Sequence, residues 1–160
     1  METNIFSKSF WKGYIGFGFV AALLYASITA SVIAGVHQSE NTWQLYIGNA
    51  AFAGVVLLYV WLKRFTIPTG SLKVIAGAIV TAMGVFFSCL LLLLALALMP
   101  LQPFASANTP VTNPLDSNSG QVWNIFINAI MVNFLWGAIT AAVFGLALQR
   151  PQAKLSAGNE

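Results

Sequence analysis

The stretch "NIFINAIMVNFLWGAITAAVFGLAL" (Asn124–Leu148) carries three asparagines in an apolar run that contains no charged residue. A membrane-spanning helix needs about 20 consecutive, predominantly apolar residues, so this stretch is long enough to cross a bilayer. An amide without a hydrogen-bond partner is costly in hydrocarbon. The same stretch therefore predicts both a transmembrane helix and polar contacts between that helix and its neighbours.

Three further apolar runs precede this stretch. Together they give four segments without Asp, Glu, Lys, Arg or His: Gly13–Val36, Trp43–Leu62, Val74–Met99 and Val122–Leu148. The chain is 58% hydrophobic and 7% charged, whereas soluble domains carry about 25% charged residues. A chain of 160 residues is too short to bury four such helices on all sides in a soluble core. We therefore expect one all-α integral membrane domain over residues 1–160, with four transmembrane helices in an up-down antiparallel bundle.

The basic residues indicate how these helices are oriented. They lie before the first run, between the second and third, and after the fourth: Lys8, Lys12, Lys63, Arg64, Lys73, Arg150 and Lys154. The connections at residues 37–42 and 100–121 contain none. The positive-inside rule then predicts a multi-pass membrane protein, with both termini in the cytoplasm and an outer loop at 100–121. Seven scattered basic residues are too few for a nucleic-acid-binding patch.

Residue types that perform catalysis are nearly absent from the four runs. His37, Glu40 and Asp116 lie outside them, and Cys89 stands alone in the third. An enzyme needs a nucleophile, a base, a metal ligand or a cofactor anchor, so we expect no catalysis, no cofactor and no metal site. Transporters and channels usually place ionisable residues along their pathway. Transport of a neutral or lipophilic solute along a route lined by amides therefore remains, as does transport by an oligomer.

Small residues at four-residue spacing predict which helices touch. Lipid tails are as apolar as leucine, so membrane helices associate where small residues let their backbones approach. The first and fourth runs each carry a long ridge of this kind: Gly18, Ala22, Ala26 and Ala30, and Ala129, Asn133, Gly137, Ala141 and Gly145. Weaker sets are Ala50 and Gly54 in the second run, and Gly77, Thr81, Gly84 and Ser88 in the third. We expect the two long ridges to pack on each other, either within one copy of the chain or between two copies, at a right-handed crossing of about −40°.

The asparagines of the fourth run point in two directions on an ideal α-helix. At 3.6 residues per turn Asn124 and Asn128 share a face, and Asn133 lies about 140° away from Asn128. Both directions need a polar partner, so we expect this helix to be buried on two sides. Asn49 in the second run lies at a similar depth to Asn128. We predict that these two amides meet in the outer half of the bundle.

Asn133 and Trp136 both lie near the expected bilayer midplane, although tryptophan prefers the membrane interface. Asn133 can join helices by hydrogen bonds worth roughly 0.6–2 kcal/mol each. Alternatively, Asn133 and Trp136 form a polar spot in a lipid- or ligand-binding crevice, with Tyr25 of the first helix as another wall. An aqueous pore is a third interpretation.

Three segments carry a resemblance that covers most of the chain: "KSFWKGYIGFGFV", "IGNAAFAGVVLLYVWLKR" and "GAITAAVFGLALQRP". In these segments the chain resembles the uncharacterised small four-helix inner-membrane proteins of bacteria. The resemblance implies an architecture and no biochemical role.

From these features we expect a non-catalytic membrane protein that acts as an oligomeric, accessory or scaffold subunit of a membrane complex. Its expected partners are the lipid bilayer and either further copies of the same chain or a larger complex. The alternative is a small transporter or channel for a neutral or lipophilic solute, with Asn133, Trp136 and Tyr25 lining a crevice.

Overall fold

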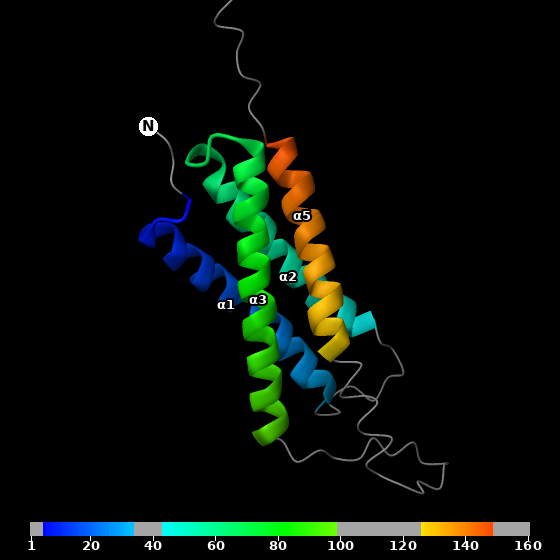
Figure 1. The fold of residues 1–160 in the computed structure, drawn as a ribbon. Coiled ribbons are helices and arrows are strands. Elements are labelled where there is room, and N and C mark those ends of the chain that lie inside the picture. The colour runs from blue at the N-terminus through cyan, green and yellow to red at the C-terminus, as the bar shows by residue number, and fades with distance from the viewer. Residues whose placement is uncertain (1–4, 34–42, 99–125, 149–160) are drawn as a thin grey trace, which may run out of the picture.

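The structure is a computed structural model that describes residues 5–33, 43–98 and 126–148. Within these ranges the chain is helical and forms no strand (Figure 1). The elements are α1 (Lys8–Ile33), α2 (Trp43–Leu62), the short 3-10 helix η1 (Lys63–Phe65), α3 (Gly70–Leu98), the π-helical segment η2 (Asn128–Val132) and α5 (Asn133–Ala147). The outer loop expected at 100–121 and the amide of Asn124 lie outside the described residues.

Four helices are long and apolar enough to cross a membrane, which confirms this part of the sequence prediction. The candidate spans are Lys8–Ser31, Tyr46–Phe65, Gly70–Ala95 and Asn128–Ala147. Two helices begin before their apolar runs, since α1 starts at Lys8 and α3 at Gly70. The runs were defined by the absence of charged residues, which delimits the expected hydrocarbon region. A helix can extend beyond that region into the membrane interface, where charged residues are tolerated.

The four helices alternate in direction, as Figure 1 shows, so that the start of α1, the turn between α2 and α3, and the end of α5 lie at one end. Extensive contacts join α3 to both α1 and α5, and α2 likewise packs on α1 and α5. Direct contact between α1 and α5 is minimal. Helices α1 and α5 therefore occupy one diagonal of the bundle, and the parallel helices α2 and α5 are neighbours.

The predicted packing of the first helix on the fourth is therefore wrong. Both long ridges are packing surfaces, but each one faces α3. A Cβ atom at Gly18 would lie 2.8 Å from the Met83 Cβ and 3.0 Å from the Gly84 nitrogen. A Cβ at Gly137 would lie 2.5 Å from the Thr81 Cγ2. The set of small residues on α3, which is the weaker one in sequence, thus contacts both ridges. The sequence prediction failed because residue spacing marks a packing face without identifying the helix that covers it.

Further along the same interface, α5 follows α3 closely. Gly77 meets the side chain of Ala141, and Gly145 meets Val74, with hypothetical Cβ atoms at 2.6 Å and 2.8 Å respectively. The Thr81 hydroxyl donates to the Gly77 carbonyl at 2.9 Å, so its polar atom is satisfied within its own helix. The whole Thr81 side chain lies against Gly137, with the Cγ2 and the Oγ1 at 2.5 Å and 2.6 Å from a hypothetical Cβ, so any larger residue at Gly137 would push the two helices apart.

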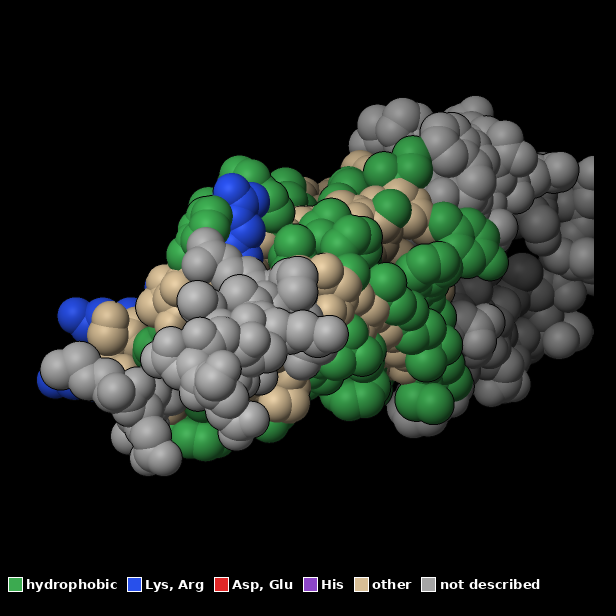
Figure 2. All heavy atoms as spheres, turned by 90° about the horizontal axis from the view of Figure 1, so that it is seen from above, with side chains coloured by type: hydrophobic (Ala, Val, Ile, Leu, Met, Phe, Trp, Pro, Cys, Tyr) green, Lys and Arg blue, Asp and Glu red, His purple; other side chains and the backbone are tan. Residues whose placement is uncertain are grey.

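The outer surface of the described bundle is apolar. Leu90, Leu93, Leu94 and Leu98 of α3 are all exposed, as expected for the leucine-rich end of that helix. Figure 2 looks onto the end of the bundle at which α1 begins; hydrophobic side chains cover much of the described surface visible there, and the Lys and Arg side chains appear in separate places toward the left of the view. This distribution suits contact with lipid tails and leaves polar groups at one end.

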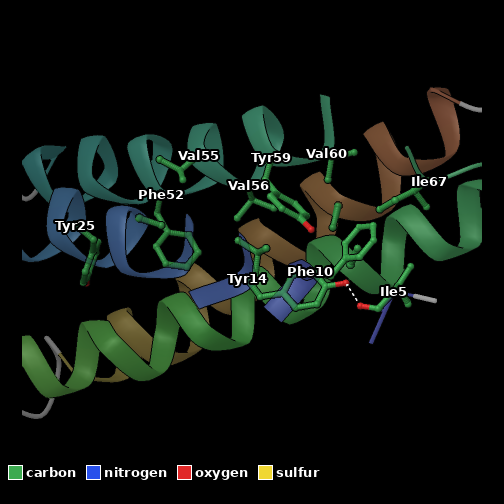
Figure 3. Close-up of a cluster of buried hydrophobic side chains, with 14 of the residues drawn as sticks. Ile5, Phe10, Tyr14, Tyr25, Phe52, Val55, Val56, Tyr59, Val60 and Ile67 are labelled. Atoms are coloured by element: carbon green, nitrogen blue, oxygen red, sulfur yellow. Dashed lines mark hydrogen bonds between the residues drawn. The ribbon is translucent and has the colours of Figure 1, made fainter. Parts of the chain in front are cut away.

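Two polar contacts fix the end of the bundle at which α1 and α3 begin. The buried Lys73 ammonium donates to the carbonyl of Leu148 at 2.8 Å, just beyond the last turn of α5. A cation there satisfies a free carbonyl and complements the negative end of the helix dipole. Nearby, the Tyr14 hydroxyl donates to the Ile5 carbonyl at 2.8 Å, and its ring packs near Tyr59 (Figure 3).

The α1–α3 interface predicts a large effect of side-chain volume at Gly18. We expect Gly18→Leu to lower the free energy of unfolding by roughly 1–3 kcal/mol, because the new side chain would collide with the backbone of α3. Gly16→Leu is the matched control, since a Cβ at Gly16 meets nothing within 4 Å. Unfolding in mixed micelles, followed by circular dichroism, measures both variants. Equal losses in the two would contradict this interface.

Candidate functional site

Polar side chains from all four helices are buried in the half of the bundle that lies away from Lys73. One pair is hydrogen-bonded: the Tyr25 hydroxyl of α1 donates to the Asn128 Oδ1 of η2 at 3.0 Å. Tyr25 is fully buried, and its ring packs against α2 where Gly48 leaves room. A Cβ at Gly48 would lie 3.2 Å from the Tyr25 Cδ2. The long phenol side chain thus joins two helices that stand on a diagonal.

Several other buried polar atoms in this region have no hydrogen-bond partner among the described residues. Asn49 is 2% exposed and Asn133 is 0% exposed, and neither the oxygen nor the nitrogen of either amide is paired. The hydroxyl groups of Thr29 on α1 and Ser88 on α3 share this state. Buried polar groups in proteins are nearly always paired, so such a concentration marks the candidate functional site.

The π-helical segment η2 changes where the asparagines point. The backbone N–H of Asn133 donates to the carbonyl of Asn128, which is a contact five residues back. This wider turn places Asn133 above Asn128, much as residues four apart align in an α-helix. The predicted separation of about 140° assumed an unbroken α-helix and is therefore wrong. Single π turns occur often at functional sites.

The predicted meeting of Asn49 and Asn128 is also wrong. Asn128 accepts its hydrogen bond from Tyr25, and the Asn49 amide is unpaired. The prediction compared only the depths of Asn49 and Asn128 along the bundle axis. Depth along the helix could not show that the longer Tyr25 side chain on α1 would form the hydrogen bond to Asn128.

The structure separates Trp136 from the other walls of the expected crevice. Tyr25 and Asn133 are fully buried, whereas Trp136 is 52% exposed on the outer face of α5. Of the remaining predicted packing residues, Gly18, Ala22, Ala26, Gly137, Ala141 and Gly145 are buried and Ala30 is half-buried. The sequence analysis did not single out Thr29, although its hydroxyl lies one turn from Tyr25 on the same face.

The chemistry available at this site consists of amides and hydroxyl groups. The described ranges hold no group of three His, Cys, Asp or Glu side chains that could bind a metal. Amides and hydroxyls donate and accept hydrogen bonds at neutral pH without changing charge. The arrangement can therefore join helices, or hold a neutral polar group, within an apolar surround.

Comparison of the chain with protein-family models, with curated proteins and with solved structures gave no match.

A double-mutant cycle tests the bond between Tyr25 and Asn128. We expect Tyr25→Phe and Asn128→Leu each to destabilise the protein, with a coupling free energy of roughly 0.6–2 kcal/mol between them. The pair Asn49→Leu and Asn128→Leu is the control and should show additive effects. Unfolding in mixed micelles provides all the free energies. Coupling in the control pair and none between Tyr25 and Asn128 would contradict this site.

Proposed function

We propose that this protein is a non-catalytic, multi-pass protein of the bacterial inner membrane that works as an oligomeric or accessory subunit of a membrane complex. Two of its buried polar side chains join its helices, Tyr25 through Asn128 and Lys73 through the carbonyl of Leu148. Its outward faces are apolar and carry large side chains, which suits contact with lipid and with other membrane helices.

The observation that carries this proposal is the position of Trp136. It lies 12 residues from Leu148, whose carbonyl binds the Lys73 ammonium at the basic end of the bundle. At 1.5 Å per residue this distance is about 18 Å, which is close to the middle of a hydrocarbon layer of about 30 Å. Tryptophan favours the membrane interface over this depth. A neighbouring protein surface would account for a half-exposed tryptophan here.

Residues beside Trp136 extend the same outward surface. Leu135, Ile139 and Val143 of α5 are all exposed and lie within about 100° of Trp136 around the helix. We propose that these side chains, with Trp136, form the contact surface to a second subunit, and we call it the Trp136 face. Aromatic residues are enriched at protein interfaces because they contribute a large contact area with few rotatable bonds.

The charge distribution supports an orientation with both termini in the cytoplasm. The described residues contain five charged side chains, Lys8, Lys12, Lys63, Arg64 and Lys73, and all are cations. They belong to the start of α1, the end of α2 with η1, and the start of α3, which share one end of the bundle. Under the positive-inside rule that end faces the cytoplasm.

One observation favours the alternative, a small transporter or channel for a neutral or lipophilic solute. The unpaired amides of Asn49 and Asn133 lie in the core beside the Tyr25–Asn128 pair. A route lined by amides would pass near them and would exclude Trp136, which faces outward.

Reporter fusions test the orientation. Alkaline phosphatase fused within residues 100–120 should be active, because this enzyme folds only outside the cytoplasm. Green fluorescent protein fused after Lys154 should fluoresce, because it requires the cytoplasm. An active phosphatase after Lys154 would contradict the proposed topology.

Cysteine cross-linking in native membranes tests the Trp136 face. In a Cys89→Ser background, Ile139→Cys should form a cross-linked dimer or a cross-link to another membrane protein, and adding Trp136→Ala should reduce the yield. The control is Phe19→Cys, which places an exposed cysteine at a comparable depth on α1. Equal yields at the two positions would contradict the proposal.

A further inference from the structure

An apolar groove lies between α2 and α5 near the basic end of the bundle. Its volume is about 590 Å³, and it opens to the outer surface. The lining residues are Gly54, Leu57, Leu58, Trp61, Phe144 and Leu148. None of these residues belongs to the Trp136 face or to the buried polar site. The groove is therefore a separate feature of the molecule.

Gly54 leaves space at one end of this groove. It is exposed, and a Cβ atom built on it would meet nothing within 4 Å. The lining residues of α2 follow at successive turns from Gly54 to Trp61, a distance of about 10 Å along the helix. The groove thus runs along the bundle axis, which is the direction in which lipid tails lie in a bilayer.

A cation is held at the other end of the groove. The Arg64 guanidinium stacks over the ring of Trp61 at 4.1 Å and over the ring of Phe65 at 4.5 Å. Trp61 is itself a wall of the groove, so the stacking places the guanidinium beside the end of the groove at Trp61. Arginine presents planar donors that suit phosphate oxygens. None of the described residues is acidic, so no carboxylate in these ranges competes for it.

We propose that this groove binds an anionic phospholipid, with one acyl chain along Gly54, Leu57 and Phe144 and the phosphate at Arg64. The apolar lining matches an acyl chain, and the cation at the basic end matches the headgroup of the leaflet on that side. Basic pockets between transmembrane helices on the cytoplasmic side are typical sites for anionic headgroups. A helix from a second copy would instead cover the guanidinium and remove its charge from water.

Native mass spectrometry of the purified full-length protein tests this proposal. The probes are phosphatidylglycerol and phosphatidylcholine with identical acyl chains, added in competition. The wild-type protein should retain phosphatidylglycerol about fivefold better as its first bound lipid. Arg64→Gln should abolish this preference, because the phosphate loses its cation. Lys12→Gln is the charge-matched control and should keep it.

A second pair of variants tests the acyl-chain part of the site. Gly54→Phe should fill the groove and lower retention of phosphatidylglycerol to the level of phosphatidylcholine. Gly16→Phe adds the same side chain at another open glycine, so it should leave retention unchanged. Circular dichroism melting confirms that each variant is folded before lipids are compared.

Three outcomes would overturn the proposal. The first is wild-type preference in both Arg64→Gln and Gly54→Phe. The second is an equal loss in the Lys12→Gln and Gly16→Phe controls. The third is a change of oligomeric state in Gly54→Phe with lipid preference unchanged, which would assign the groove to a protein contact.

Discussion

The close approach of α1 and α5 to α3 is the constraint on which the rest of the structure depends. In a bilayer, helices gain little by hiding apolar surface from equally apolar lipid, so packing distance decides which helices associate. Gly18 brings α1 against the backbone of α3 at Gly84, and Gly77 brings α3 against Ala141 of α5. Once α3 holds both partners, α1 and α5 stand on a diagonal and α2 fills the remaining corner.

This arrangement decides which polar side chains can meet. Across a diagonal, a short amide on one helix does not reach the opposite helix, whereas a tyrosine does. Tyr25 reaches Asn128 because Gly48 on α2 leaves space for its ring. The amides of Asn49 and Asn133 remain inside the same bundle without a partner among the described residues. The polar site therefore follows from the packing of glycines that have no polar chemistry of their own.

The sequence predicted the number of long apolar helices and the ridges that become buried, because both depend on composition and spacing along one helix. It did not predict which helix each ridge meets, since the spacing of small residues marks a packing face and does not identify the helix that covers it. It also missed the turn at Asn128–Val132, because ideal helical angles assume an unbroken α-helix. Lys73 was predicted as a charge of the connection, whereas it lies inside α3 and caps α5. The first and last of these failures concern contacts between helices, and the second concerns a departure from α-helical geometry; residue spacing on an ideal α-helix specifies neither.

The two outward features of α5 are compatible with each other because they point in different directions. At about 100° per residue, Phe144 lies about 80° around the helix from Trp136. A subunit seated on the Trp136 face would therefore leave the groove at Phe144 open at the edge of the contact. A lipid in that groove would lie beside the interface and could contact both proteins at once. If both proposals hold, the anionic lipid content of the membrane would influence assembly, since the lipid would contribute to the same contact surface.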